Sequence, residues 1–491
     1  MSTKLNNLSE LTNVLKDNDK IIENVYRLMP FFKLERFLSV FNKAKNKGVE
    51  VSTLLISLIT FRLSGKSIPL NLAQRLSFLP KIDDNTYYRF LNNSRMNWRS
   101  LLIRVAKQFT SIVKSKTDNK SKITCFVIDD TDIEKTGKTI EFVGKIFNHV
   151  TKTYPFGFKM LLLAFWDGTS SYSIDFSFHR EKGKKGNFGL NDKELKNQFS
   201  KKRESKLPSY KRVKELDSSK ITNTITMLKR AVKNGYVATY VLMDSWFVND
   251  QMIKGIRAIK NGAMHILGMC KMDNRKYSIN NQELNSHQIV AKHSRKKGKY
   301  SKKFKSHYFS MQAEYKGETV KLFYVQYNHS KNWNLLLTTD LKLSFVQTVE
   351  LYQIRWTIEV MFKECKQYLG LGRSQNTDFD GQIADTTLAL ITHTILTLQK
   401  RFSAYETMGG LFRDTQQLLL EMNLWERLVK VFIKMVLELI EILNIDMEEV
   451  IYKLLQNDSV SNKLLTMLKA MVEVNDNPKK VDNPVLINVN I

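Results

Sequence analysis

The sequence predicts an α/β protein: a mixed β-sheet core, interrupted by a β-rich insertion and flanked by α-helical regions at both ends. Three observations support this class. Helical spacing of apolar residues dominates 1–115, strand-like runs alternate with helices from about 122 to 271, and helical spacing returns after about 341. The chain has 491 residues, a length typical of about two to four domains.

The charge balance indicates a polyanionic partner. The chain has 77 Lys and Arg against 48 Asp and Glu, a formal net charge of +29. An excess of this size usually marks a nucleic-acid-binding protein, although a merely basic surface is the alternative.

The three cysteines are Cys125, Cys270 and Cys365. They form no CxxC pair, which argues against a disulfide framework or a structural zinc site and for a reducing compartment.

The N-terminal segment predicts no membrane association. It lacks the apolar region of a signal peptide, and its most apolar run, 51–63, is too short to span a bilayer. We therefore expect a cytoplasmic protein.

Residues 1–115 are expected to form a helical DNA-binding domain. Within it, a short helix near Thr86 could be the second helix of a helix-turn-helix, with simple helical packing as the alternative.

The central region carries the elements of the core sheet. The strand "ITCFVID" begins near 122, and 158–168 and 171–179 read as a hairpin. A helix at 218–234, the strand "YVATYVLMD", a helix at 249–261 and the strand "AMHILGMC" follow. The order β-β-β-α-β-α-β is that of a ribonuclease H-like fold. Residues 180–212 interrupt it with twelve Lys or Arg against four Asp or Glu, predicting a basic loop that contacts phosphate or is simply solvated.

The remaining segments complete the predicted domain organisation. The core occupies 116–271 and 341–402, and a β-rich insertion fills 272–340. The helical C-terminal region, 403–475, is a candidate for dimerisation, although its apolar stripe could equally fill an intramolecular core. Residues 476–491 form a polar tail.

Carboxylates follow two strands of the predicted sheet. Asp129 and Asp130 end one strand and Asp244 ends another. Carboxylates at neighbouring strand ends can converge on one cleft, and oxygen ligands favour Mg²⁺ or Mn²⁺. Glu359, on a later helix, could supply a third carboxylate. The alternative is ordinary: an Asp after a strand is often a turn former or a helix cap.

The helix predicted over 352–366 places unlike polar groups together. At about 100° per residue, its polar side chains Tyr352, Arg355, Glu359 and Lys366 share an arc roughly 60° wide, beside an apolar face. Arg355 and Glu359 are also spaced for an ordinary i,i+4 ion pair.

Taken together, these motifs resemble a known family. The spacing Tyr-x2-Arg-x3-Glu-x6-Lys, the "DDT" at 129–131 and the "MDSWF" around Asp244 resemble the signature of bacterial insertion-sequence transposases of the DDE type. That family has a ribonuclease H-like core with a β-strand insertion just before the glutamate helix. The resemblance spans about 122–402, and the helical N-terminal region also fits.

The resemblance implies roles for specific residues. Asp130, Asp244 and Glu359 would be catalytic and would bind two Mg²⁺ ions, with Mn²⁺ as a possible substitute. Asp130 is preferred over Asp129 because Asp directly precedes Thr in the family motif. Four residues would contact DNA: Tyr352, Arg355 and Lys366 through phosphates, and Trp333 by stacking on a flipped base. A core or rim position is the alternative for Trp333.

The expected activity follows from the same resemblance. The enzyme would cut an insertion sequence at its terminal inverted repeats and join the 3′ ends to target DNA, working as a homodimer on double-stranded DNA. Two alternatives remain: a catalytically inactive DNA-binding protein derived from such an enzyme, or a ribonuclease H-like nuclease without strand transfer.

Overall fold

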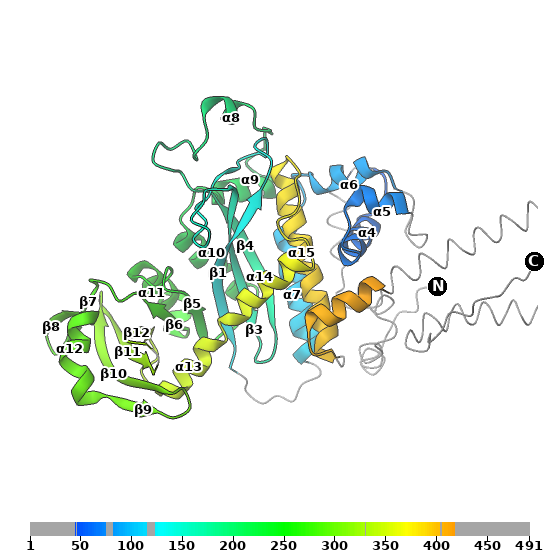
Figure 1. The fold of residues 1–491 in the computed structure, drawn as a ribbon. Helices are drawn as coiled ribbons and strands as arrows, with labels where there is room; N and C mark the ends of the chain where they lie inside the picture. Colours follow the sequence, from blue (N-terminus) through cyan, green and yellow to red (C-terminus); the bar gives the residue numbers. More distant parts are fainter. Residues whose placement is uncertain are drawn as a thin grey trace, which may run out of the picture. The chain divides into compact units, whose positions relative to one another are not determined.

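The computed structural model of the chain describes residues 45, 47–74, 82–114, 123–328, 330–402 and 405–417. The described residues fall into two compact units: one extends to Tyr87 and resumes at Ile395, and the other is Tyr88–Thr394. The second unit contains the sheet and every predicted site residue (Figure 1). Of the predicted C-terminal region, only 405–417 is described, and the tail lies outside the described residues.

The first unit is helical where it is described. It contains α4 (Val51–Leu63), α5 (Ile68–Gln74) and the start of α6 (Asp84–Leu91). The helix expected near Thr86 is α6. Its Tyr87 is fully buried and contacts Phe61 edge to face, with ring centroids 5.4 Å apart, so this ring stabilises the packing of the helices.

Five strands form the core of the sheet. The long strands are β1 (Cys125–Lys135), β3 (Phe156–Trp166) and β4 (Ser171–His179), which pair antiparallel. β5 (Tyr240–Met243) and β6 (His265–Cys270) lie parallel to β1, in the order β4-β3-β1-β5-β6. The predicted mixed α/β core is confirmed, and the predicted hairpin is β3–β4. A short strand, β2 (Gly144–Lys145), pairs with the start of β3.

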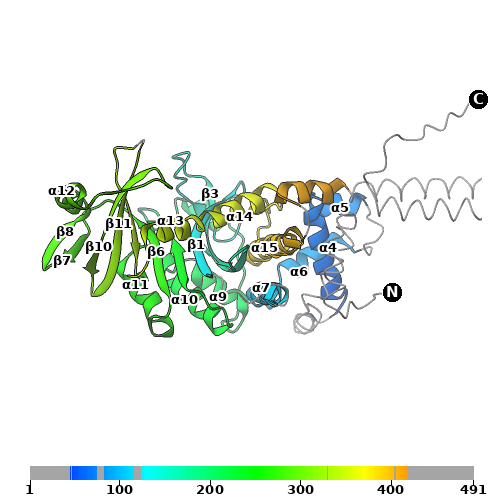
Figure 2. The same ribbon diagram turned by 90° about the horizontal axis from the view of Figure 1, so that it is seen from below.

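Helices cover both faces of this sheet (Figure 2). One face carries α7 (Trp98–Lys114), α9 (Pro208–Glu215), α10 (Lys220–Lys233) and α11 (Asp250–Arg257). The other carries α14 (Trp356–Gln367) and the start of α15 (Phe379–Phe402), whose Phe379 ring meets Phe158 and Phe178. The predicted domain boundary at 115 falls after α7, a helix that groups with the sheet because its buried face packs on β4.

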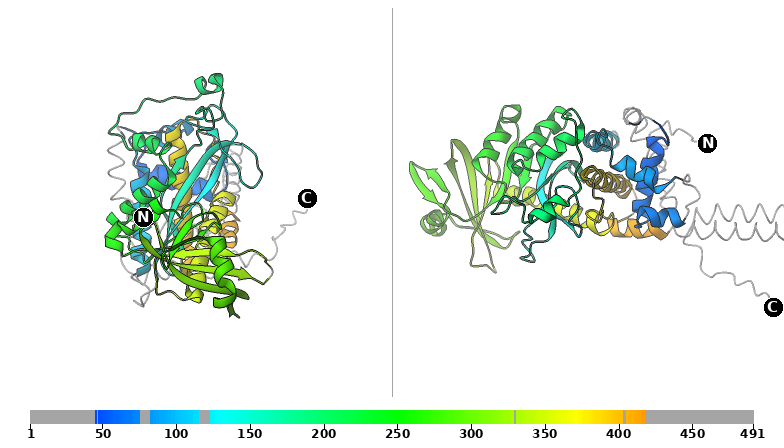
Figure 3. Two further views of the ribbon diagram at one scale, coloured as in Figure 1. Left: turned by 90° about the vertical axis from the view of Figure 1, so that its left-hand side faces the viewer. Right: turned by 90° about the horizontal axis from the view of Figure 1, so that it is seen from above.

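The insertion continues the same sheet. It comprises β7 (Lys276–Ile279), β8 (Gln282–Asn285), α12 (Ser286–Lys297), β9 (Lys299–Ser301), β10 (Ser306–Tyr315), β11 (Glu318–Tyr327) and β12 (Asn334–Thr338). β12 pairs antiparallel with β6, so the insertion strands extend the core edge rather than forming a separate sheet (Figure 3). The sequence predicts β-rich structure here but not this junction.

The basic stretch after β4 is held at both ends. It contains α8 (Asp192–Lys196) and leads into α9. Arg203, whose side chain is 3 % exposed, lies 2.6 Å from Glu141 and 3.3 Å from both Asp378 and Asp380. These buried ion pairs fasten the stretch to the start of α15, while most of its lysines remain exposed. No helix in the described part of the chain is both long and apolar enough to cross a bilayer.

Candidate active site

Asp129 and Asp130 lie on opposite faces of β1. In the antiparallel register, Asp129 stands opposite Leu162 and Asp130 opposite Leu161 of β3, and successive side chains of a strand alternate between faces. β5 pairs with β1 only as far as Ile128. Both aspartates therefore follow the point where the sheet opens beside β1.

Asp129 faces the helix that carries Glu359. Its Oδ2 lies 3.2 Å from Nη1 of Arg355, and Nη2 of Arg355 lies 2.7 Å from Oε1 of Glu359. Arg355 occupies the turn between α13 (Phe345–Gln353) and α14, so the single predicted helix over 352–366 is in fact two. Short-range bonds from the amides of Ile354 and Arg355 tighten this turn. One buried guanidinium thus bridges two carboxylates.

Asp244 joins this group from the end of β5. Burial is the main cause that raises the pKa of Asp129 to about 7. The nearby charges of Asp130 and Asp244 add to the increase, and the charge of Arg355 opposes it. Asp244 is not the cap of the next helix, because Asn249 accepts the hydrogen bond from the Met252 amide at the start of α11. The helix-cap alternative for Asp244 is therefore wrong.

Asp130 points to the other face of β1 and lines the cleft that also contains Lys366. Its Oδ2 accepts a hydrogen bond from Nζ of Lys220, at the start of α10 on the opposite face of the sheet. Because successive side chains of a strand alternate between faces, Asp129 is the one of the two that shares the face of Arg355 and Glu359. The choice of Asp130 as the first metal ligand, based on the Asp-Thr motif, stays a prediction.

Lys366 lies at the edge of a cleft beside β1. Its Nζ donates a hydrogen bond to Oγ1 of Thr131 over 2.8 Å, and partial burial lowers the pKa of its ammonium group. The cleft has a volume of about 690 Å³ and is lined by Lys366, Lys220, Asp130 and Trp246, among others. Lys366 is therefore positioned to meet an anionic group that enters there.

Tyr352 and Trp333, the other two predicted DNA contacts besides Arg355 and Lys366, each pack against protein neighbours. The Tyr352 side chain is buried, which raises the pKa of its phenol, and its ring centroid lies 5.6 Å from the Arg355 guanidinium. Trp333 precedes β12 and packs edge to face on Phe309, with ring centroids 5.4 Å apart. This contact agrees with the alternative of a rim Trp in the insertion.

Two residues to which the sequence analysis gave no role also line this cleft. Trp246, two residues after Asp244, is 62 % exposed, and Nζ of Lys271 lies 3.4 Å from its ring centroid. His149 lies beside the same indole, with centroids 5.7 Å apart. The sequence could have indicated Trp246 as a cleft residue, because it follows Asp244 by two positions. No feature of the sequence indicates that His149 lies at the cleft.

The carboxylates fit a hard divalent cation by their chemistry. Asp129 and Asp244 present oxygen donors, and Asp244 lies close enough for its charge to act on Asp129. Arg355 holds a positive charge between Asp129 and Glu359. Carboxylate oxygens are preferred ligands of Mg²⁺ and Mn²⁺. In the described part of the chain, no group of three or more His, Cys, Asp or Glu side chains lies close enough together to hold one metal ion.

Comparison with known proteins assigns this arrangement to a family. The family described as "Transposase DDE domain" matches residues 120–395, which is more than half of the chain. The matched range contains β1, β5, α14 and the insertion. No curated protein matches the sequence. The chain belongs to the transposase DDE-domain family, as its motifs predicted.

Proposed function

We propose that the protein is a DNA transposase that cuts an insertion sequence at its terminal inverted repeats and joins the 3′ ends to target DNA. The observation that carries this proposal is the chain of ion pairs from Asp129 through Arg355 to Glu359, beside Asp244. An isolated ion pair on the surface contributes little to stability and says little about function. Carboxylates from two strands and one helix that lie together, one of them Asp129 with a raised pKa, are typical of a reaction site.

In this proposal Asp129, Asp244 and Glu359 would hold the metal ions, Mg²⁺ or Mn²⁺. Bound ions of this kind supply an activated water oxygen and stabilise the leaving oxygen of a phosphodiester. Asp129 replaces Asp130 as the first ligand. Arg355 orients the two carboxylates it bridges, and the buried ring of Tyr352 supports that guanidinium rather than contacting DNA directly.

Lys366 is proposed to contact the DNA backbone. Its ammonium group lines the cleft beside β1 and is held by Thr131. Lys220 lines the same cleft. The stacking role of Trp333 stays a prediction from the resemblance.

The core fold, the roles of the terminal regions and the cellular location are also proposals. The strand order β4-β3-β1-β5-β6 supports a ribonuclease H-like core. We propose that the N-terminal helical region binds DNA and that the C-terminal region supplies a homodimer contact, because two element ends must be held together. The buried cysteines Cys125, Cys270 and Cys365 are compatible with the reducing cytoplasm.

The test uses purified full-length protein, Mg²⁺, a plasmid carrying the element with both ends, and a separate target plasmid. Products in which element ends are joined to the target support the proposal. Cutting without joining would instead indicate a nuclease. DNA binding alone, unchanged in an Asp244→Asn variant, would indicate a DNA-binding protein without catalysis and would contradict the proposal.

A further inference from the structure

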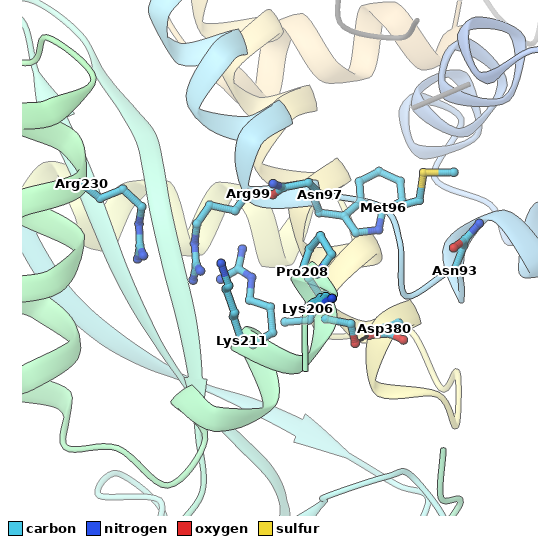
Figure 4. Close-up of a pocket in the computed structure, with 13 residues that line it drawn as sticks. Asn93, Met96, Asn97, Arg99, Lys206, Pro208, Lys211, Arg230 and Asp380 are labelled. Carbon is cyan, nitrogen blue, oxygen red and sulfur yellow. Dashed lines mark hydrogen bonds between the residues drawn. The ribbon is translucent and has the colours of Figure 1, made fainter. Parts of the chain in front are cut away.

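A second cavity lies beside β4, at the edge of the core sheet. It has a volume of about 380 Å³ and lies between the starts of α7, α9 and α15, bounded also by α10 (Figure 4). Asp175 of β4 stands opposite Leu163, which in turn stands opposite Ile128. Since Ile128 and Asp129 alternate between faces, Asp175 and the helices above it are separated from Arg355 and Glu359 by the sheet.

Cationic side chains dominate this cavity. Its lining contains five of them and one carboxylate, that of Asp380; the cations are Arg99, Lys206, Lys211, Arg212 and Arg230. In Figure 4, Arg99 and Arg230 extend from different helices, and Lys211 extends from α9 toward the same region. Asp380 is already engaged by Lys201, Arg203 and Ser209. The lining therefore has a large positive excess.

The guanidinium groups outnumber the carboxylates beneath them. Asp175 and Glu215 are the acidic partners of Arg99, Arg212 and Arg230. Asp175 lies 2.8 Å from both Arg99 and Arg230, whereas it lies 3.9 Å from Arg212, and Glu215 lies 3.6 Å from Arg212. Arg212 is thus the least well compensated member of the network.

Arg212 also has an unsatisfied donor. Its side chain is 5 % exposed, and within the described part of the chain no acceptor bonds to its Nη2, although Nη1 donates to the Phe176 carbonyl. A buried donor without an acceptor is costly. Burial, together with the like charges of Arg99 and Arg230, lowers the pKa of Arg212 to about 9. An anion in the cavity would give Nη2 an acceptor and would compensate the positive charge of Arg212.

We propose that this cavity is a phosphate-binding site, distinct from the carboxylate cluster that we propose as the catalytic centre. Arginine forks and lysine ammonium groups are the usual partners of phosphate oxygens. The exposed side chains of Lys206 and Lys211 give the site an entrance from solvent. The phosphate belongs either to a DNA backbone or to a soluble phosphate ester, and the chemistry of recognition is the same for both.

The test measures inorganic phosphate binding to the full-length protein by isothermal titration calorimetry, without divalent metal and at constant ionic strength against chloride. The main variant is Lys206→Ala/Lys211→Ala. Its matched control is Lys196→Ala/Lys214→Ala, which removes two exposed lysines of α8 and α9 that do not line the cavity. Both variants lose the same charge, and neither removes a buried group.

The proposal predicts saturable phosphate binding that the main variant weakens about tenfold, a loss of about 1.4 kcal/mol, while the control changes it less than about twofold. Arg212→Lys, with folding checked by circular dichroism, should also weaken it, because the fork is lost. Phosphate binding no stronger than that of chloride would overturn the proposal, as would equal losses in the two lysine variants.

A second arm identifies the source of the phosphate. If duplex DNA displaces phosphate and the main variant also weakens DNA binding relative to the control, the ligand is a DNA backbone. If DNA and phosphate bind independently, the ligand is a soluble phosphate ester. Because these measurements use no divalent metal and no cleavage step, a protein that failed to cut DNA could still pass them.

Discussion

The carboxylate of Asp129 lies 3.2 Å from the guanidinium of Arg355, a residue 226 positions later in the chain. The same guanidinium lies 2.7 Å from Glu359. A single cation therefore links a strand of the core sheet to the helix that follows the insertion. This link is our reason for proposing Asp129 rather than Asp130 as the first metal ligand, and it makes the proposed site sensitive to changes at Arg355.

Replacing Arg355 by Ala should destabilise the protein by about 2 kcal/mol, because Asp129 would keep a buried carboxylate without its cation. Arg355→Lys should cost less, since the positive charge remains but the two-pronged fork is lost. Urea denaturation of both variants at pH 8 measures the difference. Equal stability of Arg355→Ala and the unmodified protein would contradict the bridging role.

Glu359→Gln should abolish DNA cutting while leaving binding to element ends intact. The amide keeps the shape of the side chain but removes the charge proposed to hold a metal ion, and a loss of at least about a thousandfold in rate is expected. Cleavage and gel-shift assays separate the two effects. Glu364→Gln is the control: it removes a carboxylate of the same helix, paired with His393 over 2.8 Å, and should leave cutting largely intact.

Divalent cations should stabilise the folded protein even without DNA. Binding to the native state raises its melting temperature in proportion to the logarithm of ion concentration above the dissociation constant. We expect Mg²⁺ and Mn²⁺ to raise it in the unmodified protein and to have no effect on Asp244→Asn. In the control Asp217→Asn, which removes an acidic partner of Arg180 elsewhere, the increase should persist. A persistent increase in Asp244→Asn would place the ion elsewhere.

His179 should make stability depend on pH. Burial, helped by the charge of Lys220, lowers the pKa of its imidazole from 6.5 to about 4. Below pH 6.5 the unfolded chain therefore binds a proton that the folded protein does not, so stability falls as pH decreases toward 4. Between pH 7 and pH 5 the loss should be about 2 kcal/mol.

The His179→Gln variant isolates this contribution, because glutamine cannot titrate. Denaturation of both proteins at several pH values should give parallel curves above pH 7 and a steeper decline for the unmodified protein below pH 6.5. Curves that remain parallel down to pH 5 would show that His179 is protonated equally in the folded and unfolded states.

The core was predictable because its signals are local. The apolar run ending at Asp129, the hairpin of β3 and β4, and the helix predicted over 218–234, which is α10, are each specified by residues close together in the sequence. The family followed from the spacing of four residues in one segment combined with the aspartate motifs at 129–131 and around Asp244. That the insertion extends the sheet through β12 and β6 depends on pairing between distant strands, which a local pattern cannot reveal.

The residues of the site were predicted less completely, for the same reason. A motif in which Asp precedes Thr favours Asp130, but the face of each aspartate depends on the register of β1 with β3. The burial of Tyr352 and the separate position of Trp333 depend on packing partners such as Arg355 and Phe309. The cationic cavity combines α7, α9 and α10 with the start of α15, so no single segment indicates it.

Comparison of Asp129→Asn with Asp130→Asn tests the central claim most directly. The two substitutions change adjacent residues by the same chemistry, and only the face of β1 differs. The measurement is the rate of cutting at an element end, in Mg²⁺, with DNA binding measured in parallel. We predict that Asp129→Asn loses cutting by at least about a thousandfold while binding DNA, and that Asp130→Asn retains most of its activity. Loss of cutting in Asp130→Asn, with activity retained in Asp129→Asn, would contradict the account.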